Sequence, residues 1–230
     1  MTTNFNYARL MGVSFLLLII FGFFGMAYVP ISLYDYSSAT QTLTQVKANP
    51  QLLRYGILAT VLMNASSLFL AIFTYRWLKK FSSTLAVSAA LLLMTGAIIS
   101  LVNELNNVSV LHFSQHSANL EMIALHLNLY QAGVFIATLF WGLWLLPVGY
   151  ALLFQSRWVR LFGILLIISG IGYMLDSLFY LLWYQKILVS DYTFLGEIIF
   201  TIWALFQRKP EFEPSKNALP EKRFPANFLR

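Results

Sequence analysis

The sequence contains very little charge. Asp, Glu, Lys and Arg make up 10% of its 230 residues, whereas hydrophobic residues make up 59% and the mean hydropathy is +0.69. A soluble globular domain typically contains about 25% charged residues. This composition excludes a water-soluble domain, a disordered chain and a collagen-like chain, and it predicts a polytopic membrane protein.

Cysteine is absent and histidine is scarce. The lack of cysteine excludes disulfide bonds, thiolate metal sites and thiol nucleophiles. Three histidines are too few for a histidine-rich di-iron enzyme, and no two of them lie at membrane depth on facing spans, as bis-histidine haem requires. The short motifs of serine hydrolases, zinc proteases and nucleotide-binding loops are also missing. We therefore expect no cofactor and favour a non-enzymatic role, with an intramembrane enzyme acting on lipid as the less favoured alternative.

Six apolar stretches are long enough to be membrane-spanning helices. Crossing about 30 Å of hydrocarbon takes about 20 helical residues, and the stretches show no alternation of the kind that barrel strands require. They cover residues 10–33, 52–78, 84–105, 124–154, 159–183 and 192–207. The sequence thus predicts an all-α, six-span membrane domain over residues 1–207. Residues 208–230 contain four prolines and mixed charge, and are predicted to form a basic, largely disordered tail.

Lysine and arginine are distributed unevenly between the two ends of these spans. Twelve of the fifteen lie at the N-terminus, in the loops after the second and fourth spans, and in the C-terminal tail. The opposite side has only Lys47, Arg54 and Lys186. The positive-inside rule therefore places both termini in the cytoplasm. Because this is the pattern of a topology signal next to anionic lipid, we expect membrane lipids as partners and no nucleic acid; a protein partner or a second copy is left open.

Ionisable residues within the spans are concentrated in the outer half of the membrane. At a rise of about 1.5 Å per residue, Asp176 lies about 12 Å and Glu197 about 9 Å from the outer surface. Charged groups inside a membrane usually face protein or a water-filled cavity. We therefore predict an outward-facing ligand site built around Arg54, Asp176 and Glu197. Its predicted rim consists of Glu104, His126 and Gln131.

Two interpretations of this polar site are open. In one, Arg54 pairs with Asp176 or Glu197, and the ion pair only fixes how the helices pack. In the other, the residues line a pocket that binds a small solute, a cation or a lipid headgroup. Two acids against one arginine leave a surplus carboxyl group, which must be protonated, solvated or occupied by a cation. This surplus favours the pocket.

Small and polar residues recur at helical spacing in four spans. Such stripes allow helices to approach one another closely in a membrane. The longest stripe runs along the second span, and the others lie on the third, fifth and sixth: Gly56, Thr60, Asn64, Ser67, Ala71 and Thr74; Gly96, Ser100 and Glu104; Ser169, Gly172, Asp176 and Tyr180; Thr193, Glu197, Thr201 and Ala204. These faces are predicted to be buried against neighbouring helices.

His112 and His116 are the weak candidates for a metal site. Their i, i+4 spacing would place both on one face of a helix, but zinc takes three or four protein ligands. The surrounding segment, between Asn106 and Asn119, is polar, and we expect it to be an outer loop rather than a helix. Solvated loop histidines therefore explain the pair better than a metal does.

Five groups of short motifs follow one another along the chain. The motifs are Ala8-Arg9 with Gly12, Leu53-Arg54-Tyr55-Gly56-Ile57, Gly142-Leu143 with Gly149-Tyr150, Gly170-Ile171-Gly172-Tyr173 with Asp176-Ser177, and Gly196-Glu197. In this respect the chain resembles the bacterial membrane family called domain of unknown function 4386, from about Tyr7 to Gln207. The resemblance implies six spans in a bacterial cytoplasmic (inner) membrane, and it implies no activity.

Two positions depart from the family pattern. Trp144 stands where the family often has a histidine, and Val159 stands where it often has a proline. The first departure removes any role that the histidine would support. Arg54, Asp176 and Glu197 all fall on motif positions, which assigns them no chemistry.

Overall fold

The computed structural model describes residues 6–207, and this part of the chain is helical. The predicted tail, residues 208–230, lies outside the described residues. The helices are α1 (Tyr7–Gly22), the π-helix η1 (Phe23–Tyr28), α2 (Val29–Leu33), α3 (Ala39–Ala48), α4 (Pro50–Leu78), α5 (Ser83–His116), α6 (Leu120–Leu152), α7 (Arg157–Trp183), α8 (Ser190–Thr193) and α9 (Leu195–Phe206).

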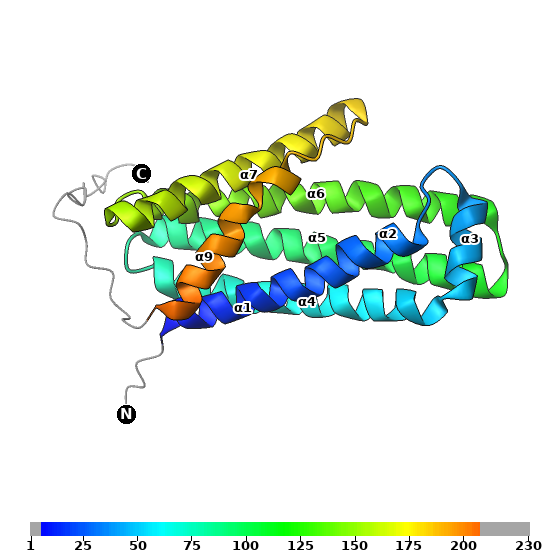
Figure 1. Ribbon diagram of the computed structural model, residues 1–230, viewed down its shortest axis with the longest axis horizontal. Coiled ribbons are helices and arrows are strands. Elements are labelled where there is room, and N and C mark those ends of the chain that lie inside the picture. The colour runs from blue at the N-terminus through cyan, green and yellow to red at the C-terminus, as the bar shows by residue number, and fades with distance from the viewer. Residues whose placement is uncertain (1–5, 208–230) are drawn as a thin grey trace, which may run out of the picture.

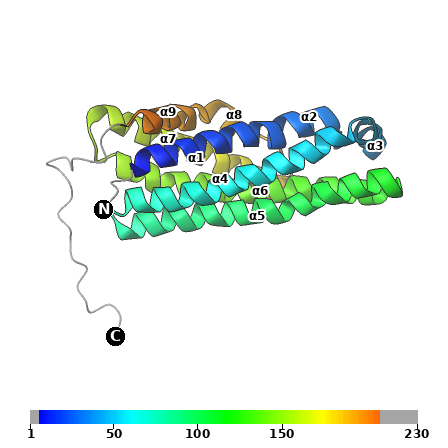
Figure 2. The same cartoon turned by 90° about the horizontal axis from the view of Figure 1, so that it is seen from below.

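Five helical segments are long and apolar enough to cross a membrane. They are Tyr7–Leu33, which joins α1, η1 and α2, together with α4, α5, α6 and α7. By length and hydropathy the chain is therefore a multi-pass, all-α membrane protein. α4, α5 and α6 lie side by side, α1 packs on α4, and α7 packs on α6. α9 crosses between α1 and α7 and contacts both (Figures 1 and 2).

The third and fourth predicted spans continue well beyond the membrane thickness. α5 has 34 residues and α6 has 33, so each is about 50 Å long, against about 30 Å of hydrocarbon. The loop expected between Asn106 and Asn119 was wrong: α5 runs to His116, and only three residues form the turn into α6. The polar residues do not break the helix because one face of α5 stays buried, including Asn107, Val110 and Ser114. α3 lies across this end of the bundle (Figure 1).

The first span contains one wide helical turn. Pro30 has no backbone N–H and its ring displaces the carbonyl of the preceding turn, so a regular α-helical hydrogen bond to Met26 cannot form. The chain adopts the π-helix η1 directly before it. π-helical turns occur frequently at functional sites. Phe23, Met26 and Ala27 of η1 all line the cavity described below.

The sixth predicted span is broken. Residues 184–189 form no helix, and they are followed by the short helices α8 and α9. At about 18 Å, the 12 residues of α9 are shorter than the hydrocarbon core. After α7 the chain reverses at Tyr184, which has a left-handed backbone (φ 54°). At the C-terminal end of α9, the carbonyl oxygen of Gln207 accepts a hydrogen bond from the Asn6 side-chain amide (2.6 Å). α9 therefore ends beside the start of α1.

Glycines allow α6 and α7 to touch backbone to backbone. A Cβ atom added at Gly142 would lie 2.6 Å from the carbonyl oxygen of Gly170, and one added at Gly163 would lie 2.6 Å from that of Gly149. Small residues at a crossing are the usual way in which membrane helices gain van der Waals contact. Gly170, which belongs to one of the glycine motifs quoted above, therefore packs against α6.

We expect Gly170→Ala to destabilise the protein by about 1–3 kcal/mol, because the added methyl group meets backbone that cannot move independently. The measurement is the thermal unfolding midpoint (Tm) of purified protein in detergent, followed by circular dichroism. Ile171→Ala is the control, since Ile171 is 47% exposed on the outside of the bundle. An equal loss in both variants would contradict the assignment of this contact.

Candidate functional site

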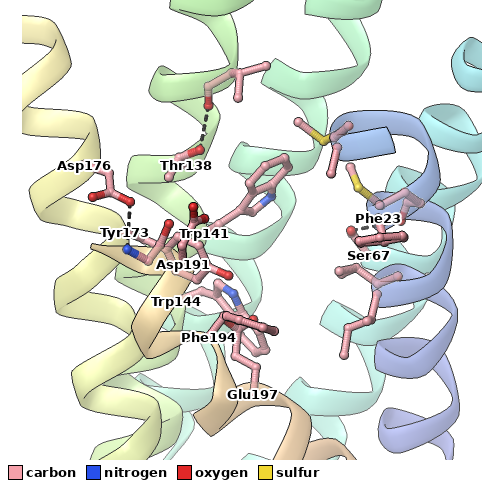
Figure 3. Close-up of a pocket in the computed structure, with 18 of the residues that line it drawn as sticks. Phe23, Ser67, Thr138, Trp141, Trp144, Tyr173, Asp176, Asp191, Phe194 and Glu197 are labelled. Atoms are coloured by element: carbon pink, nitrogen blue, oxygen red, sulfur yellow. Dashed lines mark hydrogen bonds between the residues drawn. The ribbon is translucent and has the colours of Figure 1, made fainter. Parts of the chain in front are cut away.

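A half-open cavity of about 600 Å³ lies between the helices of the bundle. α1 and η1 form one side of it, α7, α8 and α9 form the other, and α6 runs between them (Figure 3). Met63 and Ser67 of α4 and Leu93 of α5 complete the lining. The cavity is therefore bordered by the two irregular parts of the fold, the π-helix and the broken last segment.

Most of the cavity wall is apolar and aromatic. Trp141 and Trp144 of α6 and Tyr173 of α7 lie near one another in the wall (Figure 3). Trp144 is 2% exposed and packs edge-to-face with Phe15 of α1, with 5.6 Å between ring centroids. Phe194, between α8 and α9, adds a further ring. The indole at position 144, where the family often has histidine, is therefore part of the cavity wall.

Three carboxyl groups lie on one side of the cavity. Asp176 comes from α7, Asp191 from α8 and Glu197 from the first turn of α9 (Figure 3). Among the described residues that line the cavity, none is a lysine, an arginine or a histidine. The predicted pair Asp176 and Glu197 is thus brought to one cavity. Asp191 was not among the site residues predicted from the sequence.

Asp176 holds the start of α8. The side chain is 1% exposed; its Oδ1 accepts from the Val189 amide (2.6 Å) and its Oδ2 from the Ser190 amide (2.9 Å). Hydrogen bonds to an ionised acceptor are shorter and stronger than neutral ones. Small residues on the same face of α7 also contact α8. A Cβ atom at Gly172 would meet the Thr193 side chain, and the Ser169 hydroxyl donates to the Thr193 carbonyl oxygen (2.5 Å).

Glu197 is the acid with one unpaired oxygen, although its carboxyl group also has a hydrogen bond with the Tyr173 side chain. Its Oε1 is buried and has no hydrogen-bond donor within the described part of the chain. The Tyr173 side chain lies against this carboxyl group. A buried polar atom that is left unpaired costs about 1–3 kcal/mol. Glu197 is therefore the residue of this cavity that a bound cation or hydrogen-bond donor would satisfy.

Arg54 is not part of this group. It is exposed near the beginning of α4, where its Nη2 donates to Oε1 of Gln115 on α5 (3.4 Å). The interpretation in which Arg54 pairs with Asp176 or Glu197 is therefore wrong, and Arg54 does not line the cavity. The sequence put Arg54 level with the acids because the outer ends of the helices were taken to coincide with the membrane surface. α4 and α5 instead extend beyond it, and Arg54 lies on that extension.

Glu104 and His126 belong to a second polar cluster, between α5, α6 and the end of α2. Glu104 is 4% exposed, and its Oε1 accepts from the Asn107 amide (2.7 Å), whose oxygen accepts from the Tyr34 hydroxyl (2.8 Å). His126 Nδ1 lies 2.9 Å from Oδ1 of Asn106. Neither residue lines the cavity, so the predicted rim is a separate cluster. Gln131 is half-buried on α6 and also lies outside the lining.

His112 and His116 share a face of α5. Their rings stack with 4.6 Å between centroids, and His116 Nδ1 lies 3.0 Å from the His112 carbonyl oxygen. No third ligand joins them, because residues 6–207 contain no group of three or more His, Asp and Glu side chains that could hold a metal ion. The pair belongs to the helical extension outside the cavity.

We expect Asp176→Asn to lower stability by about 1–3 kcal/mol, because the new amide nitrogen cannot accept from a backbone N–H and one buried donor loses its partner. The readout is the Tm of the purified protein. Asp191→Asn makes the same change in charge at an exposed acid that holds no backbone amide, and its Tm should match the wild type. If Asp176→Asn also melts like the wild type, Asp176 does not hold α8.

The helical architecture defines a polytopic membrane protein, and a comparison with protein families specifies it further. The family described as domain of unknown function (DUF4386) matches residues 10–207. The chain belongs to this family, as its ordered glycine motifs predicted. No curated protein and no solved structure matches the chain.

Proposed function

We propose that the central cavity is a binding site for a small solute, cation or lipid headgroup, in a transport, sensing or accessory role. The observation that supports this most directly is the buried Oε1 of Glu197, which has no partner among the described residues, in a cavity whose described lining contains three acids and no base. A cavity of about 600 Å³ is of the size that small-molecule sites have. A group with a positive charge or an N–H donor would satisfy Glu197 there.

The broken last segment supports the same proposal. Irregular backbone at membrane depth is tolerated where it is buried in protein or lines a cavity. Many transporters place substrate next to the ends of such interrupted helices. Here Leu188 and Ser190, on either side of the point where helix resumes, both line the cavity. We include in the proposal that residues 184–207 form a sixth, interrupted crossing in a bacterial cytoplasmic membrane, with both termini inside.

The alternative is a structural or assembly protein whose polar residues only fix helix packing. Asp176 favours it, because both of its oxygens are already bonded to backbone amides. Glu197 favours the binding function, because nothing in the described part of the chain bonds its Oε1. Substitutions of Asp176 and of Glu197 can therefore distinguish the structural function from the binding function.

The absence of cysteine makes the crossing number directly measurable. In intact cells, a membrane-impermeant maleimide should label Gln45→Cys, in the exposed part of α3, and should not label Lys79→Cys, at the end of α4. Lys209→Cys tests the last segment. With six crossings it reacts only after the cells are permeabilised; labelling from outside would mean five crossings and would overturn the proposed topology.

Ligand binding can be tested by thermal stability. Purified protein is heated with a panel of metal ions, inorganic anions, amines and soluble lipid headgroups. A ligand at 100 times its dissociation constant stabilises by about 2.7 kcal/mol if it binds only the folded state. We expect at least one class to raise Tm in the wild type and in Glu121→Gln, an exposed acid on α6, but not in Glu197→Gln. A flat response across the panel would favour the structural alternative.

A further inference from the structure

We infer that the ligand of this cavity is a monovalent organic cation with a bulky apolar body, such as a substituted ammonium. The inference rests on the proposed binding function and names the class of ligand. Two properties of the cavity define it: where the charge is located, and what covers the rest of the wall.

The charge of the lining is negative and confined to one side. Asp176, Asp191 and Glu197 come from α7, α8 and α9, whereas the facing side is built by α1 and η1 (Figure 3). Lys186 lies two residues before Leu188, and its ammonium group sits over the Tyr36 ring, 4.5 Å from the centroid. That contact engages Lys186 outside the lining, and no described residue of the lining is a base that could pair with the acids. An anionic ligand would be repelled by this wall.

The rest of the wall does not suit an inorganic ion. Calcium and magnesium take six or more oxygen ligands arranged around the ion. Opposite the acids, apart from the Ser67 hydroxyl, which donates to the Met63 carbonyl oxygen, the lining consists of hydrocarbon and thioether groups, including those of Phe15, Phe23 and Met26. Within residues 6–207 the acids do not form a group that could hold a metal. A hydrated ion would therefore leave half of its shell against apolar surface.

An organic cation matches both sides. Its charge can approach Glu197, and aromatic rings favour a cation placed over their faces. Trp141, Trp144 and Tyr173 lie in the same part of the wall as the acids (Figure 3). Its apolar groups would be removed from water against α1 and η1. Met26 and Met63 add flexible side chains, which adapt to ligands of different shape.

The test uses two probes of the same shape and opposite charge, tetraphenylphosphonium and tetraphenylborate. Binding to the purified full-length chain in zwitterionic nanodiscs is measured by equilibrium dialysis, with empty nanodiscs subtracted to remove partitioning into lipid. We expect saturable binding of tetraphenylphosphonium and none of tetraphenylborate. Glu197→Gln should weaken the phosphonium binding by about tenfold or more, because a buried charge loses its partner.

Glu121→Gln is the matched control, and its affinity should be that of the wild type. Asp191→Asn is a second variant that should reduce the affinity if Glu197→Gln does not fold, because Asp191 lines the same side of the cavity. Equal binding of the two probes, or an unchanged affinity in both acid variants, would overturn the cationic class and leave the cavity as a binding site. If neither probe binds but another member of the thermal panel does, the class is wrong and the proposed function stands. If nothing binds in either experiment, both are wrong.

Discussion

The fold depends on how one carboxylate satisfies a break in the last helical segment. In a membrane, backbone N–H groups that lose their helical partners need others, since the lipid offers none. Asp176 supplies two such partners, at Val189 and Ser190. Because these bonds fix the returning chain against α7, the acids at positions 191 and 197 are held on one side of the cavity. The site is thus a consequence of the break, and the break is stabilised by Asp176.

Close packing supplies the rigid frame around this break. α6 and α7 meet at paired glycines, and Asn64 of α4 donates to the Ser100 hydroxyl of α5 (3.0 Å). Membrane helices gain little from hydrophobic burial, so contacts of this kind decide their arrangement. The second-span stripe predicted from sequence illustrates this: Thr60, Asn64 and Ser67 are all fully or almost fully buried. Because the long helices are packed rigidly, η1 and the interrupted last segment can border a cavity that does not collapse.

Much of this arrangement could be predicted from local sequence. The positions of the long helices, the buried stripes and the meeting of Asp176 with Glu197 all follow from hydropathy and helical spacing. The position of Arg54 could not be predicted, because sequence does not show how far a helix extends beyond the lipid. The polar end of α5 was misjudged for a related reason: Asn103, Asn107 and Ser114 are buried against neighbours rather than solvated.

The interrupted segment and the aromatic wall needed the three-dimensional structure. Residues 184–189 are mainly apolar and contain no proline or glycine, so nothing in their composition indicates a break in the helix. The break is explained by the hydrogen bonds from the Val189 and Ser190 amides to Asp176. Trp141 and Trp144 have the i, i+3 spacing of one helix face, but sequence alone cannot distinguish a cavity wall from ordinary core. Pro30 was the one available signal for the π-helix.

The hydrogen bond between Asn6 and Gln207 has a consequence for biosynthesis. It joins the two ends of the described chain, and nearby the backbone of Gly12 lies so close to α9 that an added Cβ atom would be 2.8 Å from the Leu205 nitrogen. Because α1 is synthesised before α9, it acquires this neighbour only when α9 has been made. Until then, one wall of the cavity is missing and the small-residue face of α1 is open to lipid. The cavity is therefore complete only after α9 has joined α1 and α7, and a chain that stops before α9 lacks the wall that carries Glu197.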